Sequence, residues 1–252
     1  MPTGSTTSDF PLASTIADAY RRTFADRAFL IRAAGLWALL GLLGGLLAVG
    51  SGDEPGTGKP GGDATMWPAL LFSAIGWIGL SAVTTHRIRA LVCNDPPPRL
   101  MAPLDRHVAR YILAEFVVAA LAALPSLVAL VVLAPIGGVP LALSAGTVAA
   151  IFLFARLHLA LAAAAIGGRG IALELSWRAT SSVWPKAAVG LIACSSPLAL
   201  VASPLGAAIA AAGAPLTGRA IPTLTAFAQA GIFATFLASS WRRLVDASSD
   251  AT

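Results

Sequence analysis

Four polar side chains interrupt the most apolar stretches of this 252-residue sequence, and they are the first candidates for chemistry: Glu115, Arg156, His158 and Gln229. Two of them lie in the segment FLFARLHLALAAAAIGG, residues 152–168. An unpaired charge in hydrocarbon costs about 3 kcal/mol on insertion scales. A charged side chain in such a place therefore pairs with an opposite charge, extends to the membrane surface, or binds a ligand.

Glu115 and Arg156 are expected at similar depths in neighbouring helices. If a helix enters near Val139, Arg156 lies about 25 Å along it at roughly 1.5 Å per residue, a few Å short of the far boundary. Glu115, counted inward from Tyr111, lies at a similar depth from the same side. We therefore predict a structural ion pair between Glu115 and Arg156. The alternatives are that each side chain extends to the surface separately, or that the two form a headgroup or ion site.

His158 and Gln229 favour structural interpretations. No second His or Cys lies at metal-ligand spacing from His158, so we expect an interfacial histidine that faces away from Arg156. Gln229 lies near the middle of an apolar run and is expected to hydrogen-bond a neighbouring helix. Pro125, Pro197 and Pro204 interrupt two other runs, with Ser195 and Ser196 beside the second proline. Such breaks can line a transport site, although proline is also common in spans without that role.

The sequence has no motif of a common catalytic centre. We find no HExxH, GxSxG or P-loop, no GxGxxG after a strand, and no acidic cluster that would hold a divalent metal. We therefore expect neither an enzyme nor a bound cofactor or metal.

The composition is that of a membrane protein. Hydrophobic residues make up 57% of the chain and charged residues 12%, and the mean hydropathy is +0.79. The net charge of +5 does not indicate nucleic-acid binding, because an arginine excess in such a chain reports topology and attraction to anionic lipids. The two cysteines suggest no disulfide framework.

Six apolar runs are long enough to cross a bilayer. They predict an all-α, polytopic membrane helix bundle with spans at about 29–50, 67–85, 111–134, 139–160, 187–212 and 221–241. Of the 17 lysines and arginines, only Lys59 and Arg219 fall on the outer side of this arrangement. The positive-inside rule then places both termini in the cytoplasm. The excess of arginine over lysine favours a bacterial inner membrane. Residues 1–27 lack the apolar core of a signal peptide, so we expect the first span to be retained.

Two further segments are expected to be amphipathic helices in the cytoplasmic interface. In residues 15–29 the apolar face consists of Ile16, Tyr20 and Phe24, and Asp18 is expected to pair with Arg22. In residues 170–184 the apolar face consists of Ile171, Leu175, Ala179 and Val183, and Glu174 is expected to pair with Arg178. Their recurrence before a pair of spans is consistent with an internal repeat, or simply with the amphipathicity common before a span. The candidate interfacial anchors are Arg21, Arg22, Arg178, Trp177 and Trp184. The chain thus divides into a cytoplasmic segment (1–28), a membrane domain (29–241) and a tail (242–252).

Three segments carry a resemblance: IADAYRRTF, THRIRALV and ARLHLALAAAAIGGRGIALELSWRATS. With the six spans, they resemble uncharacterised bacterial six-span proteins similar to the membrane domain joined to glycerophosphodiester phosphodiesterases. The resemblance implies a companion to a catalytic domain rather than a catalyst, because His86 and Arg87 lack the Gly and the acidic ligands of that catalytic centre.

We therefore expect a non-enzymatic membrane protein that interacts with lipid or acts as a scaffold. Its partners would be anionic membrane lipids, and a protein partner or a second copy is possible. A transporter of a small molecule or lipid is the alternative function.

Overall fold

The structure is a computed structural model that describes residues 10–50, 66–99, 101–168 and 172–246. Over these ranges the regular structure is entirely helical, which confirms the all-α prediction. The elements are α1 (Leu12–Ala25), α2 (Arg27–Gly50), α3 (Met66–Val92), α4 (Arg106–Ile166), α5 (Leu173–Ala179), α6 (Trp184–Ser195), α7 (Pro197–Ala211), α8 (Pro215–Trp241) and a π-helical turn, η1 (Arg242–Asp246).

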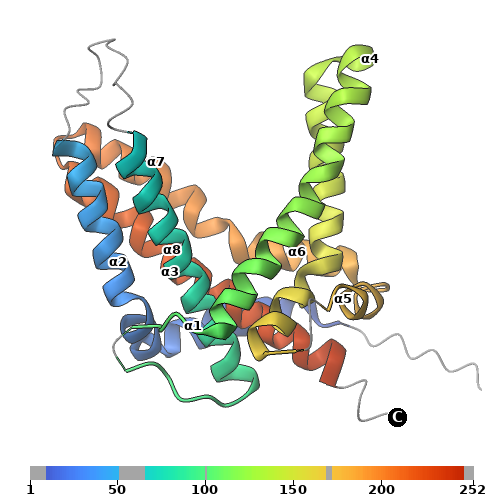
Figure 1. The fold of residues 1–252 in the computed structure, drawn as a ribbon, viewed down its shortest axis with the longest axis horizontal. Helices are drawn as coiled ribbons and strands as arrows, with labels where there is room; N and C mark the ends of the chain where they lie inside the picture. The colour runs from blue at the N-terminus through green and yellow to red at the C-terminus, as the bar shows by residue number, and fades with distance from the viewer. Residues whose placement is uncertain (1–9, 51–65, 100, 169–171, 247–252) are drawn as a thin grey trace, which may run out of the picture.

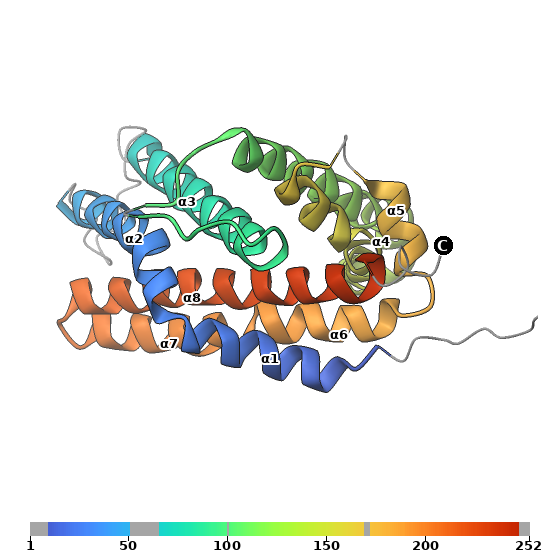
Figure 2. The same ribbon diagram turned by 90° about the horizontal axis from the view of Figure 1, so that it is seen from below.

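The helices form two diverging limbs that join at one end of the molecule (Figure 1). Helices α2, α3 and α7 make up one limb, and the two halves of α4 make up the other. Helix α8 runs diagonally from the first limb into the joined end, where α1 and α5 also lie. Seen from below, α6 and α7 follow one another alongside α8 (Figure 2). The end of α2, the bend of α4 and the α7–α8 turn therefore lie away from the end that holds α1 and α5.

Three helices of the described chain are long and apolar enough to cross a membrane: 106–166, 184–211 and 216–245. This is the pattern of a membrane protein, but the count is smaller than the six spans expected from the sequence. One reason is that the third and fourth expected spans, 111–134 and 139–160, belong to a single 61-residue helix, α4, that runs through the boundary between them.

Helix α4 bends at Gly138, whose φ of 81° and ψ of 164° lie outside the helical region. Glycine accepts a positive φ without the steric cost that a Cβ would bring. The two halves then run back along each other (Figure 1), and they meet closely at Gly146, where an added Cβ would lie 2.6 Å from the Ser126 Cα. Gly146 and Ala142, small residues spaced four apart on the second half of α4, are both buried.

The best-buried part of the molecule is the joined end. The second half of α4 is buried continuously from Ala155 to Ala165, and its alanines let neighbouring helices approach closely. By contrast, the outer α4 hairpin exposes large apolar side chains such as Val131 and Ile136, as a surface in contact with lipid does. The fold is therefore tightly packed where the limbs join and apolar on the outside where they diverge.

The expected amphipathic helices exist, but their buried faces differ from the prediction. Helix α1 buries Thr15, Ala19 and Thr23, one position before each expected residue, and Phe24 is 46% exposed. The helix packs on α6 and α8 through these small side chains, and Ile16 and Tyr20 of the expected stripe are half-buried against the same core. Its ion pair joins Asp18 to Arg21 at 2.7 Å, rather than to Arg22.

Helix α5 is shorter than the predicted 170–184 and buries a polar face. The Ser176 and Thr180 hydroxyl groups donate to the Arg156 carbonyl oxygen at 2.7 and 3.0 Å, and Leu175 is exposed. The expected Glu174–Arg178 pair is confirmed at 2.6 Å. Ile171 of the predicted stripe lies outside the described residues.

Candidate functional site

A cavity of about 390 Å³ lies between α3, α4, α8 and the junction of α6 with α7. Two of the four polar residues singled out in the sequence, Glu115 and Gln229, line it together. The other polar groups of its wall come from three helices, and they are Ser81, Thr84, Tyr111 and Ser195. The rest of the wall is apolar and aromatic. A pocket with a few converging polar groups in an apolar wall is the usual form of a ligand site.

Glu115 projects from the first half of α4, about 14 Å from the start of the helix at roughly 1.5 Å per residue. Its Oε2 accepts a hydrogen bond of 2.9 Å from the Ser81 hydroxyl group, and the Trp77 indole also hydrogen-bonds this carboxyl. Trp77 is held in turn by Phe116, whose ring lies edge-on at 4.9 Å. A carboxylate has about four lone-pair positions, so this group keeps acceptor capacity toward the cavity.

The opposite wall is a helix that is broken at Pro197. Because proline has no N–H and its ring clashes with the preceding turn, it ends α6 at Ser195 and begins α7. The break leaves backbone groups of residues 193–198 without their usual helical partners, which is costly inside a membrane.

Two side chains from other helices satisfy these groups. The Gln229 amide of α8 donates to the Cys194 carbonyl oxygen and accepts from the Leu198 N–H at 3.0 Å. The Tyr20 hydroxyl of α1 donates to the Ala193 carbonyl oxygen at 2.7 Å. Gln229 thus spans the two atoms that would otherwise bond each other in a continuous helix. The expectation that it hydrogen-bonds a neighbouring helix is confirmed.

A second, apolar cavity of about 300 Å³ adjoins the first, and the two share Phe154 and Ser195 in their walls. Its other walls come from alanine, leucine and isoleucine side chains of α4 and α6. A partly polar cavity therefore lies next to an apolar one beside the helix break.

Arg156 and His158 lie elsewhere, and the predicted Glu115–Arg156 pair is wrong. In the described chain, no ion pair or hydrogen bond joins these two side chains. The Arg156 guanidinium stacks on Trp177 of α5, 4.2 Å from the ring centroid, and its carbonyl group holds Ser176 and Thr180. Arg156 thus fixes α5 against α4.

His158 is fully buried between helices, so it is not an exposed side chain at the molecular surface, while its expected depth at the membrane edge stays a prediction. Its Nδ1 donates to the Ala155 carbonyl oxygen at 2.7 Å, and its ring lies 6.4 Å from that of Phe236 on α8. It faces away from Arg156, as expected, and belongs to the core at the joined end.

Of the expected anchors, Trp177 is 41% exposed and Trp184 half-buried, and both rings meet Phe152 edge-on, at 6.0 and 4.8 Å. The charged anchors Arg21, Arg22 and Arg178 are exposed. These side chains lie at the joined end of the molecule, on α1, α5 and the start of α6.

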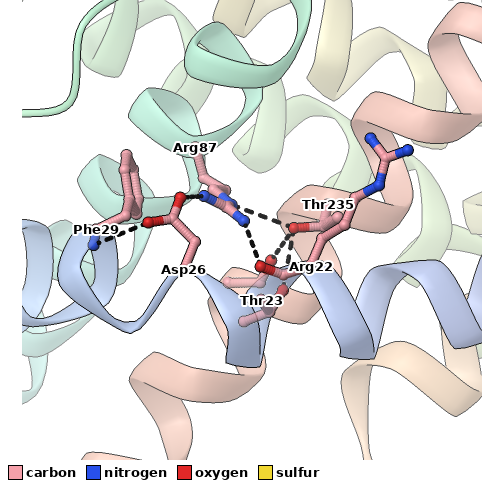
Figure 3. A network of polar contacts seen from close by, with 7 residues as sticks. Arg22, Thr23, Asp26, Phe29, Arg87 and Thr235 are labelled. Carbon is pink, nitrogen blue, oxygen red and sulfur yellow. Dashed lines mark hydrogen bonds and ion pairs between the residues drawn. The ribbon is translucent and has the colours of Figure 1, made fainter.

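The most extensive polar network was missed by the sequence reasoning (Figure 3). Arg87 lies beyond the end of the span expected at 67–85, but in the structure it belongs to α3 and is buried. Its guanidinium donates to Asp26 at 2.5 Å, to the Arg22 carbonyl oxygen at 3.1 Å and to Thr235 at 3.3 Å. It also lies over the Phe29 ring, 4.9 Å from the centroid. The network therefore joins the α1–α2 corner to α3 and α8.

A basic hollow of about 740 Å³ lies where α3 meets the start of α4. Its cationic side chains are Arg89, Arg99 and Arg106, with His86 and His107 beside them. Arg89 is paired with Asp95 at 2.5 Å.

Asp105, also in this hollow, caps α4 by accepting from the backbone N–H groups of His107 and Val108. Burial acts to raise the pKa of Asp105. The two backbone hydrogen bonds and the neighbouring histidines outweigh burial and lower the pKa below its ordinary value.

Comparison with known proteins adds no relative to this description, since no family model, curated protein or solved structure matches the chain.

Proposed function

We propose that this protein is a non-enzymatic membrane protein that binds an amphiphilic small molecule or lipid from the bilayer. The observation that carries the proposal is the pair of adjoining cavities between the limbs. The first offers the Glu115 carboxyl and several hydroxyl groups, and the second offers only an apolar wall apart from Ser195. A polar head would occupy the first cavity and an apolar chain the second.

The proposed membrane arrangement has six spans, with α4 supplying two of them. The bend at Gly138 divides α4 into halves that run back along each other, while α2 and α3 add helices of 24 and 27 residues. Residues 184–211 and α8 supply the last two spans, and the positive residues place both termini in the cytoplasm. Cysteine-labelling from each side of inner-membrane vesicles tests this topology.

The joined end would then lie at the cytoplasmic surface and contact anionic lipids. The basic hollow and the exposed arginines of α1 support this part of the proposal, because each basic residue near an anionic surface contributes about 1 kcal/mol. We also propose, from the family resemblance, that the protein is a companion to a catalytic partner. A homo-oligomeric state is a further proposal.

The test of the proposal is native mass spectrometry of the protein released gently from its own membrane. We expect one discrete amphiphile bound to the wild type and lost in Ser195→Leu, since Ser195 lines both cavities and the larger side chain would project into them. Ser144→Leu is the matched control, because Ser144 is exposed on the outer part of α4. Bulk lipid alone on the wild type, or the same ligand on Ser195→Leu, contradicts the proposal.

A transporter is the second candidate, and the broken helix is the observation that favours it. Carriers often bind substrate where a helix is discontinuous, and Ser195 beside the break faces the cavity. Ligand-dependent flux in proteoliposomes that Ser195→Leu abolishes would support transport. Tight binding without flux would support the binding role.

A further inference from the structure

We infer that the cavity at Glu115 selects an amphiphile with a positively charged head, such as a substituted ammonium or another lipophilic organic cation. This inference rests on the proposed function and names the chemical class of its ligand. It follows from the juxtaposition of one carboxyl group with several aromatic rings at a helix break.

Among the described residues, the wall of the cavity carries an acidic side chain and no basic one. Glu115 is the one carboxyl side chain among the described residues that line the cavity, and none of those residues is Arg, Lys or His. Among the residues that the structure describes, the two buried arginines are engaged elsewhere, Arg87 with Asp26 and Arg156 with Trp177. A cation in the cavity therefore meets an acidic group, and an anion meets no compensating charge.

The aromatic rings of the cavity wall also favour a positively charged ligand. Trp77, Tyr111, Phe154 and Phe233 come from three helices and line the cavity together with Glu115. The face of an aromatic ring carries negative electrostatic potential and attracts organic cations, most strongly when water is excluded. Rings and a carboxyl group in one pocket are a common means of binding a substituted ammonium.

The hydrogen bonds at Glu115 keep the carboxyl group aimed at the cavity. Ser81 and Trp77 donate from the α3 side, so they fix the side chain and leave acceptor positions for a ligand. Ser195 and Ala199 on the opposite wall are exposed, which gives a ligand in the membrane access between the limbs.

The experiment compares two probes of nearly equal size and opposite charge, radiolabelled tetraphenylphosphonium and tetraphenylborate. Each is titrated onto the full chain in phosphatidylcholine nanodiscs, and binding to empty nanodiscs is subtracted. We expect saturable binding of the cation and none of the anion. Glu115→Gln, which removes the charge at nearly constant size, should weaken cation binding at least tenfold.

The matched control is Glu174→Gln, which removes the same charge from the exposed face of α5. It should bind the cation like the wild type. Ser195→Leu is a second test that leaves Glu115 intact, and it should also abolish binding by filling the cavity. Thus the inference stays testable if Glu115→Gln fails to fold.

Equal binding of the two probes, or equal cation binding by wild type and Glu115→Gln, overturns the inference. These outcomes are separable from failure of the proposed function. If mass spectrometry finds a neutral or anionic amphiphile that Ser195→Leu loses, and the cation does not bind, the binding role stands and the charge class is wrong. If the wild type binds neither a discrete amphiphile nor the cation, both are wrong.

Discussion

Gln229 hydrogen-bonds both α6 and α7 across the break at Pro197, and the contribution of these bonds to stability can be measured. Gln229→Leu removes the partners of the Cys194 carbonyl oxygen and the Leu198 N–H. Leaving a buried polar group unpaired costs about 1–3 kcal/mol in proteins, and hydrogen bonds measured within membranes lie at the lower end, about 0.6–1.7 kcal/mol. We therefore expect Gln229→Leu to lower the free energy of unfolding by about 2 kcal/mol.

The same substitution should cost much less in a Pro197→Ala background. With alanine at 197 the helix can continue from α6 into α7, and Leu198 N–H can then donate to the Cys194 carbonyl oxygen directly. In that background we expect Gln229→Leu to cost less than about 0.5 kcal/mol, a coupling of roughly 1.5 kcal/mol between the two sites. Tyr20→Phe should show the same dependence, because the Ala193 carbonyl oxygen lacks its helical donor only while Pro197 is present.

Equilibrium unfolding in mixed detergent micelles, followed by tryptophan fluorescence, measures these costs. Thr225→Val on α8 is the control, since its hydroxyl group donates only to carbonyl groups of its own helix, at 2.8 and 3.0 Å. Its effect should be the same in both backgrounds. An equal cost of Gln229→Leu in the two backgrounds would refute the account of Gln229 as the repair of a proline break.

Three other substitutions, two of them with a matched control substitution, test the remaining structural conclusions. Asp26→Ala should lower the free energy of unfolding by about 3 kcal/mol, since it leaves the buried Arg87 cation without its carboxylate. The control, Glu174→Ala at the exposed Glu174–Arg178 pair, should change the free energy of unfolding by less than about 0.5 kcal/mol. The same unfolding assay measures both variants. Asp105→Ala should cost about 1 kcal/mol at neutral pH. The pKa of Asp105 is lower in the folded protein than in the unfolded chain. The stabilisation by the Asp105 carboxylate is therefore complete above the ordinary aspartate pKa and is lost as the pH falls through the pKa of Asp105 in the folded protein. The unfolding curves of wild type and Asp105→Ala should converge below about pH 4. Gly146→Ala should lower the free energy of unfolding by about 1–3 kcal/mol, because the added methyl group would collide with the Ser126 backbone. Gly76→Ala is the control, since its methyl group would meet open space, and it should be neutral or slightly stabilising. Equal effects of the two variants in thermal unfolding would contradict the close contact between the two halves of α4.

The sequence predicted the helices well because apolar runs and prolines are local signals. The run expected at 29–50 lies within α2 at 27–50, and the one expected at 221–241 lies within α8 at 215–241. Helix α3 extends beyond its apolar run to Val92, so Arg87 and Arg89 lie on a helix rather than in a loop. Charged residues mark the end of a hydrophobic stretch, whereas a helix continues while its backbone hydrogen bonds and packing favour it.

The sequence singled out Glu115, Arg156, His158 and Gln229, which are buried or half-buried in the structure, but it did not predict which side chains meet. Similar depth suggested that Glu115 and Arg156 form a pair, yet depth says nothing about the rotation of each helix about its axis. That rotation is set by packing, which directs Glu115 toward Ser81 on α3 and Arg156 toward Trp177 on α5. The buried faces of α1 and α5 were missed in part for a related reason. Small or hydroxyl-bearing residues such as Thr15, Thr23 and Ser176 are fully buried there, whereas Phe24 and Leu175 of the predicted stripes are exposed.

The polar groups inside this bundle differ in whether the protein itself satisfies them, and that difference identifies the residue to study. Gln229 uses its carbonyl and amide groups to close a broken helix, and Arg87 uses three donors to join α1, α3 and α8. Such residues are fully committed to the fold, so their substitution should alter stability before it alters ligand binding. Glu115 is held from one side only and faces a cavity without a protein cation. A carboxyl group in this position brings a desolvation cost that the fold does not offset, and a positively charged ligand would offset it.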